Sequence, residues 1–213
     1  SANQVTGILS GQFERSSTGS VRIEGEINAR DGVQIMAGQG QDAAQAVVVN
    51  GRVMVGGRAA GSAVNLGDLR SLNPVVERDG VIDITTPGDV LLNGKLLADA
   101  SHWNQAGGVR VVAGGNIDLG AQALVSATAA LGSGGQGGQV SLFAHGSASN
   151  AAGATLAARG DGTGAGGFIE LSAAKQIHLN SVTLDAGSDQ GQAGLAYIDP
   201  IDLEVSGSIF TNG

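Results

Sequence analysis

Two stretches of this chain follow one template. Residues 19–29 and 88–98 both read Gly, x, apolar, x, apolar, x, Gly, x, apolar, x, Ala, and a looser copy begins at Gly115. Self-similarity of this kind is typical of stacked supersecondary units. The apolar residues recur at every second position, which is the period of a strand with one buried face and not of a helix. The repeats therefore predict an all-β solenoid.

Glycine precedes four further alternating stretches in the second half of the chain. They begin after Gly107-Gly108, Gly137-Gly138, Gly166-Gly167 and Gly194, and Gly108, Gly138, Gly167 and Gly194 are 30, 29 and 27 residues apart. This spacing fits one coil of three short strands. Glycine at the corners is expected to supply positive φ and close backbone approach. Since parallel crossovers are right-handed, the predicted fold is a right-handed parallel β-helix.

The composition favours a narrow coil. The chain has 37 Gly among 213 residues and only 3% aromatic residues, so Ala, Val, Leu and Ile are expected to fill the interior. Because the repeat covers most of the chain, residues 1–213 are predicted to form a single β-helix segment. The charged stretch 67–79 is expected to leave the coil as a hairpin or loop excursion. Asp199-Pro200 is expected to end the segment near 199–206, because proline cannot donate to a ladder.

Charge and cysteine content exclude several classes of function. A net charge of −8 argues against nucleic acid or an anionic membrane surface as a partner. No apolar run is long enough for a transmembrane helix, so no membrane insertion is expected. The absence of Cys excludes disulfides and Cys-based metal sites. The chain begins with Ser1 and has no secretory signal, so we expect a mature or excised piece of a longer protein.

Three phrases carry a family resemblance. They are Val-Arg-Ile-Glu-Gly-Glu-Ile-Asn-Ala at 21–29, Gly-Gly-x-Val/Ile-x-Leu-x-Ala at 137–144 and 166–173, and Ala-Tyr-Ile-Asp-Pro-Ile-Asp-Leu-Glu-Val at 196–205. In this order they resemble the secreted exoproteins of bacterial two-partner secretion systems, the filamentous haemagglutinin type of adhesin. The resemblance covers roughly residues 19–206.

The resemblance implies a right-handed parallel β-helix that is exported through an outer-membrane two-partner transporter and lies secreted or at the bacterial cell surface. It also implies adhesion to a host-cell receptor or a bacterial exopolysaccharide, as in virulence and biofilm attachment. The secretion domain of this family carries Asn-Pro-Asn motifs, whereas this chain has only Asn73-Pro74-Val75. The segment is therefore expected to lie downstream of the secretion signal or to include only its end.

Two short motifs are candidate binding sites. Arg159-Gly160-Asp161 on an exposed turn could bind integrins, although glycine and polar residues are expected at that corner in any case. Trp103, flanked by His102 and Asn104, could stack on a sugar ring, and the alternative is a Trp packed over the edge of the coil. Binding is expected to fall to the excursion at 67–79 and to the loops 99–107 and 159–165.

Metal binding and catalysis have weaker support. The turns 160–164 and 187–191 carry one Asp each, which is too few oxygen ligands for calcium, so solvated turn aspartates are favoured. The three histidines are scattered, which argues against zinc. A polysaccharide-cleaving β-helix would need paired carboxylates. Its candidates are Asp83, Asp89, Asp99, Asp118 and Glu170.

We therefore expect a non-catalytic adhesin segment with no metal and no cofactor. Scarce aromatic residues argue against the enzyme, because a sugar-cleaving groove needs aromatic platforms. Two alternatives stay open beside the adhesin: a purely structural stalk or secretion-related segment, and the polysaccharide-active β-helix.

Overall fold

The structure is a computed structural model that describes residues 20–29, 32–37, 47–55, 80–100 and 105–212. Every regular element in these ranges is a β-strand, and every strand pair is parallel. The strands stack into a β-solenoid of about five turns, which confirms the predicted all-β parallel β-helix. The expected excursion at 67–79 lies outside the described residues.

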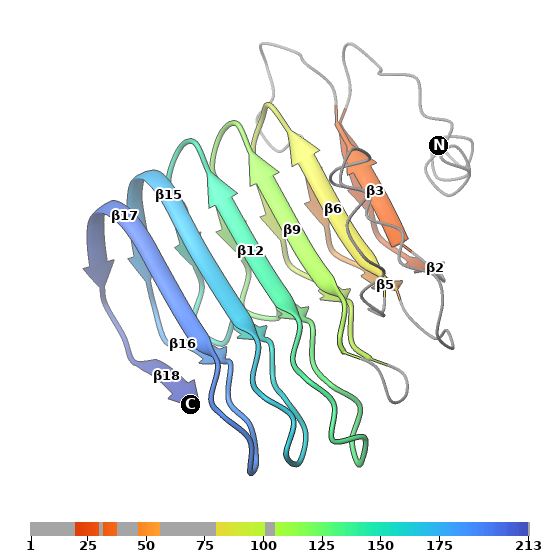
Figure 1. The fold of residues 1–213 in the computed structure, drawn as a ribbon. Helices are drawn as coiled ribbons and strands as arrows, with labels where there is room; N and C mark the ends of the chain where they lie inside the picture. The colour runs from red at the N-terminus through yellow and green to blue at the C-terminus, as the bar shows by residue number, and fades with distance from the viewer. Residues whose placement is uncertain (1–19, 30–31, 38–46, 56–79, 101–104, 213) are drawn as a thin grey trace, which may run out of the picture.

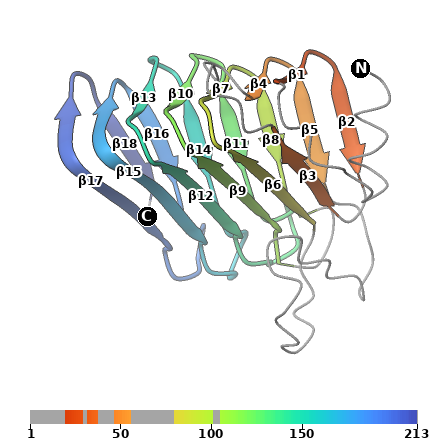
Figure 2. The ribbon, with the colours of Figure 1, turned by 90° about the horizontal axis from the view of Figure 1, so that it is seen from above.

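Each coil of the helix has three sides, and equivalent strands of successive coils lie side by side (Figures 1 and 2). The first side contains β3 (Gly32–Met36), β6 (Val81–Thr86), β9 (Gly108–Ala113), β12 (Gln139–Ala144) and the first halves of β15 (Phe168–Leu179) and β17 (Leu195–Val205). The second side contains the later halves of β15 and β17 together with β1 (Val21–Ile23), β4 (Val47–Val49), β7 (Val90–Leu92), β10 (Ile117–Leu119) and β13 (Ala148–Asn150). The third side contains β2 (Glu26–Ala29), β5 (Arg52–Val55), β8 (Lys95–Leu97), β11 (Leu124–Ser126), β14 (Thr155–Ala157), β16 (Val182–Asp185) and β18 (Ile209–Asn212).

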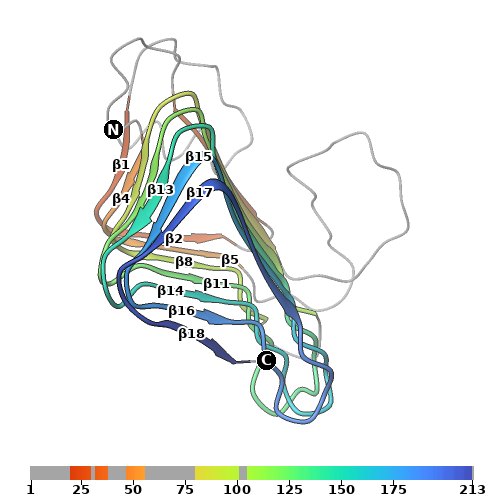
Figure 3. The ribbon, with the colours of Figure 1, turned by 90° about the vertical axis from the view of Figure 1, so that its left-hand side faces the viewer.

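Viewed along its axis, the helix has a triangular outline (Figure 3). With the last coil toward the viewer, the chain climbs the first side, descends the second and returns along the third. It therefore turns anticlockwise as it approaches the viewer, which makes the coil right-handed, as predicted. The long corner segments that join the third side to the first lie together at one vertex of the triangle.

Aliphatic side chains fill the interior in columns that follow the strand register. One column on the first side contains Ile35, Ile84, Val111, Leu142 and Leu171. Each of these five side chains is at most 2% exposed. The buried hydrophobic residues among those described are all Ile, Val, Leu or Ala. The expectation that small aliphatic residues fill a narrow coil is thereby confirmed, and each column continues from coil to coil.

The glycine pairs recur because neighbouring coils approach closely, and positive φ has no part in it. A Cβ on Gly138, Gly167 or Gly194 would overlap the carbonyl oxygen of the equivalent glycine one coil earlier. None of these three glycines has a positive φ among the described residues. Left-handed glycines lie elsewhere, in the loop turns at Gly132, Gly134, Gly153 and Gly162. The predicted close approach is confirmed, and the predicted positive φ at these pairs is wrong.

Pro200 does not interrupt the ladder, contrary to the expectation that this proline stops it, and the predicted end of the segment near 199–206 stays a prediction. β17 passes through it, with Pro200 opposite Ala173 of β15, and β18 then adds a third side to the coil. β15 has one residue more than β17 between the pairs Ala173–Pro200 and Gln176–Asp202, which marks a β-bulge. Among the described strands only β15 pairs with β17, so the missing N–H of Pro200 leaves no described strand unpaired.

Candidate functional site

The corners between the third and first sides carry a ladder of polar side chains. Its first step joins two coils through Asp99, whose carboxylate accepts hydrogen bonds from Ser126 Oγ at 2.5 Å and from the Thr128 backbone N–H at 2.8 Å. Thr128 Oγ1 in turn accepts a hydrogen bond from the backbone N–H of Arg159 at 3.4 Å. Polar groups that would otherwise lack partners at this vertex are thus paired between successive coils.

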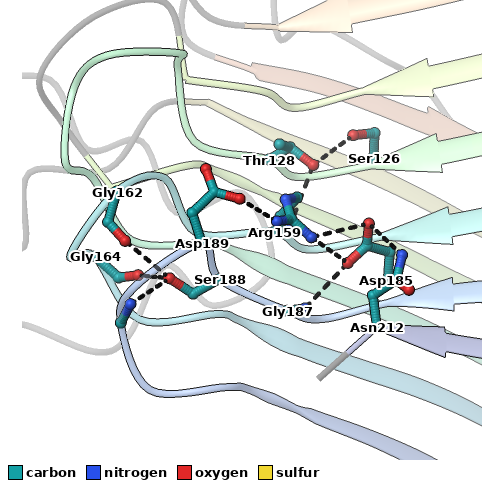
Figure 4. Close-up of polar contacts among 11 residues, drawn as sticks. Ser126, Thr128, Arg159, Gly162, Gly164, Asp185, Gly187, Ser188, Asp189 and Asn212 are labelled. Carbon is teal, nitrogen blue, oxygen red and sulfur yellow. Dashed lines mark hydrogen bonds and ion pairs between the residues drawn. The ribbon is translucent and has the colours of Figure 1, made fainter.

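Arg159 extends this ladder to the next coil (Figure 4). Its Nη1 donates to Asp185 Oδ1 at 3.2 Å and its Nη2 pairs with Asp189. The hydrogen bond that Arg159 donates to Asp189 is the main reason that the pKa of Arg159 is raised above its ordinary value. Asp185 also accepts a hydrogen bond from Asn212 Nδ2 at 3.3 Å. The guanidinium of the predicted Arg-Gly-Asp motif therefore holds two coils together.

Asp161, the acidic member of that motif, is only 8% exposed. Its Oδ2 accepts a hydrogen bond from the backbone N–H of Gly134 in the preceding coil at 2.9 Å. That bond is the main cause of a lowered pKa at Asp161; burial opposes it, and the N–H groups of Gly132 and Ser133 add to it. The expectation of a solvated turn aspartate is therefore wrong here. Integrin binding by Arg159-Gly160-Asp161 stays a prediction, and the contacts of both charged side chains favour a structural role.

In the coil that follows Asp161, the turn at residues 187–191 is closed by the hydroxyl of Ser188. Ser188 Oγ donates to the carbonyl oxygens of Gly164 at 2.6 Å and Gly162 at 3.2 Å, and it accepts from the N–H of Gly191 at 2.9 Å. The Ser188 hydroxyl therefore joins its own turn to backbone carbonyl groups of the turn in the preceding coil. Among the residues that the structure describes, no three His, Asp or Glu side chains gather as the ligands of a metal ion would.

The carboxylates proposed for a polysaccharide-cleaving enzyme lie apart. Asp83 and Glu170 belong to one column on the first side, but Arg110 and Ser141 stand between them. Asp83 pairs with Arg110 at 3.1 Å, and its side chain is only 4% exposed. Asp118 accepts a hydrogen bond from Ser149 on the second side, and Asp89 accepts one from the N–H of Asn116. Each carboxylate thus contacts a neighbouring coil, and no pair of them faces a shared space in these contacts.

Spacing alone did not predict a cluster on the second side around His178. Its Nδ1 lies 3.2 Å from Glu204 Oε2, and its Nε2 lies 2.9 Å from Ser206 Oγ. The order Ser, His, carboxylate resembles a nucleophile with its base and orienting acid. Both the His178 and the Glu204 side chains are substantially exposed, at 37% and 57%. In open water such an array lacks the dry surroundings that make charge stabilisation effective.

A second cluster that the sequence did not reveal lies on the first side of the last coils. Phe143, Phe168, Glu170, Tyr197 and Asp199 all point outward there, and we call them the aromatic–acid patch. Glu170 lies opposite Tyr197 in the register, and Ser172 lies between Phe143 and Asp199. Tyr197 is 44% exposed, and the nearby charge of Asp199, with a hydrogen bond to the same carboxylate, raises the pKa of its phenol.

The other predicted binding residues, His102, Trp103 and Asn104, lie outside the described residues. Their proposed sugar contact therefore stays a prediction. The Arg-Gly-Asp corner and the aromatic–acid patch belong to different parts of the coil, the first at the vertex and the second on a flat side.

Comparisons with known proteins add no relative to this picture. No family model, no curated protein and no solved structure matches the chain. Within the ranges that the structure describes, no helix has the length and apolar character needed to span a membrane. The fold and its contacts define a parallel β-helix protein.

Proposed function

We propose that this chain is a rigid segment of a large secreted bacterial surface adhesin, which attaches cells to host receptors, to one another or to a polysaccharide matrix without catalysis. The observation that supports the proposal is the closed aliphatic interior, which leaves the outer sides and corners of the coil for recognition. A stack of coils with one repeated register gives a stiff rod that can hold a binding surface away from the cell. Export through an outer-membrane partner belongs to the same proposal and rests on the resemblance.

A purely structural stalk is the second candidate. It is favoured by the contacts of Arg159 and Asp161, because both charged groups of the one recognisable binding motif are occupied by neighbouring coils. A stalk would bind nothing by itself. The two candidates therefore differ in one measurable property, saturable binding by the isolated chain.

The test is binding of the purified chain to host glycans, bacterial exopolysaccharides and integrin-bearing cells. Saturable binding to one class supports the adhesin, whereas no binding by a well-folded sample contradicts it and favours the stalk. Cell binding that is lost in Asp161→Glu would assign it to the Arg-Gly-Asp motif. Asp118→Glu, which changes a carboxylate on the second side, is the matched control and should leave cell binding unchanged.

A further inference from the structure

The aromatic–acid patch concentrates residue types that are scarce in the rest of the chain. Three of the four aromatic Phe, Tyr and Trp side chains in the described ranges belong to it, and only Phe210 lies elsewhere. Aromatic rings offer flat apolar faces, on which the C–H face of a sugar ring or an ammonium group can lie. Because the patch is on a flat side of the coil, these faces are presented to solvent and leave the core undisturbed.

The two carboxylates of the patch form no ion pair with a described cationic residue. Among the described residues, the ion pairs involve neither Glu170 nor Asp199. The surrounding sequence is also acidic, since residues 159–212 contain seven Asp or Glu against Arg159 and Lys175, and Arg159 is already paired with Asp185 and Asp189. A cationic ligand would therefore gain attraction at the patch, and an anionic one would be repelled.

Glu170 is held ready for such a ligand. Ser141 Oγ donates to its Oε2 at 2.7 Å from the preceding coil, and Ser172 Oγ donates to its Oε1 at 3.0 Å from the same strand. A carboxylate that is oriented before binding loses less freedom when the ligand arrives. It keeps further lone pairs with which to accept hydrogen bonds from an amine or a hydroxyl.

The spacing of the coils suits a sugar chain that lies along the helix axis. Equivalent residues in neighbouring strands are roughly 4.8 Å apart, which is close to the length of one pyranose ring. Glu170 and Tyr197 are such equivalents in β15 and β17. The strands beneath the patch pair with both neighbours up to β17, so a peptide could not add as a strand across this side.

We propose that the aromatic–acid patch binds a polymer of amino sugars with free amines, with one ring stacked on Tyr197 and an ammonium group paired with Glu170 and Asp199. This proposal deepens the proposed adhesive function and rests on it. Phe168 and Phe143 border the path of the chain on either side and supply apolar contact for adjoining rings.

The experiment compares two probes that differ only in charge: a glucosamine hexamer with free amines and its fully N-acetylated counterpart. Binding to the full chain is measured by titration calorimetry in mildly acidic buffer, where the amines are protonated. We expect the free-amine hexamer to bind saturably, and added salt to weaken this binding. The acetylated hexamer should bind at least about tenfold more weakly. Equal binding of both hexamers, or binding of neither, would overturn the proposal.

Variants separate the patch from the general acidity of the chain. Tyr197→Ala and Glu170→Gln should each weaken binding of the free-amine hexamer by about fivefold or more. Asp118→Asn removes the same charge from a Ser-bonded carboxylate on the second side and should leave binding unchanged. An equal loss in Asp118→Asn, or equally tight binding of hexalysine, would show non-specific charge attraction and overturn the patch. Circular dichroism confirms that each variant keeps its β-structure.

This experiment can fail without the adhesive function failing. If the chain binds a host glycan or exopolysaccharide saturably but not the free-amine hexamer, the proposed function stands and the amino-sugar class is wrong. If the chain binds no sugar, no polysaccharide and no cell, both proposals fall together.

Discussion

The last coil and the coils beneath it share one register but differ in how far their apolar side chains are covered. Ile177 and Leu179 of β15 are 0% exposed, whereas their register partners in β17, Leu203 and Val205, are 51% and 46% exposed. Of the seven large hydrophobic residues exposed in the described ranges, all but Leu131 belong to this last coil. The same pattern of residues is thus a core in one coil and a surface in the next.

The first coil differs from the last in its inward side chains. Ile23 and Ile27 are each only 6% exposed. Its Gly25, however, has no described atom near the position of a Cβ, whereas a Cβ on Gly94 two coils later would overlap the carbonyl oxygen of Gly51. Close approach at these glycines is therefore a property of neighbouring coils, and the cost of a substitution there should follow nearest-neighbour contacts.

The largest effect is expected from truncating a buried leucine, and the comparison is the same truncation of a half-exposed leucine in the last coil. Leu142→Ala in β12, where Leu142 is 0% exposed, should lower the free energy of unfolding by about 2–5 kcal/mol because it leaves a cavity. Leu203→Ala in the last coil should cost less than about 1 kcal/mol, since half of that side chain already meets water. Urea titrations followed by circular dichroism measure both. Equal losses would contradict the nearest-neighbour picture.

An intermediate effect is expected at the glycine column. In Gly94→Ala the new methyl group meets the backbone of the preceding coil, and the displacement should cost about 1–3 kcal/mol. Gly25→Ala is the matched control and should change stability by less than about 0.5 kcal/mol. Thermal unfolding of the two variants makes the comparison. A Gly25→Ala loss as large as that of Gly94→Ala would mean that the glycines are needed for their backbone conformation.

The smallest effect on stability is expected from the turn carboxylate Asp161, and it should depend on pH. The pKa of Asp161 is lowered in the folded chain, so its contribution to stability is complete above the unfolded pKa of about 4 and is lost as the pH falls through the folded value. Asp161→Asn should therefore unfold at a lower temperature than the parent chain at neutral pH, and the difference should shrink in acid. Ser188→Ala, which removes a hydroxyl that does not titrate there, should give a difference independent of pH. A pH-independent difference for Asp161→Asn would contradict the assignment.

The repeat pattern sufficed to predict the fold because each coil is formed by residues that are close together in the sequence. Alternation in residues such as Val109–Val112 indicates which side chains face inward, and the spacing of the glycine pairs indicates the length of a coil. Neighbouring coils then repeat the same register without further information. The expected stop of the ladder at Pro200 is not observed, because proline is tolerated on a strand that lies at an edge of the described sheet.

The polar contacts could not be predicted from the sequence with the same success. Arg159 and Asp189 are 30 residues apart, and Glu204 and His178 are 26 apart, so only the register of the folded coil brings each pair together. The Arg-Gly-Asp tripeptide reads as an exposed motif in sequence, although its two charged groups have partners in adjoining coils. Tyr197 and Glu170 likewise become neighbours only across the ladder.

The parallel ladders also determine how the molecule would respond to tension. Their hydrogen bonds point along the axis, so a pull between the first and last described coils would detach one coil at a time. Each detached coil of 27 to 30 residues would lengthen the chain by roughly 90–110 Å. A rod of this design yields stepwise under load, and it stays anchored while its outermost turns unravel.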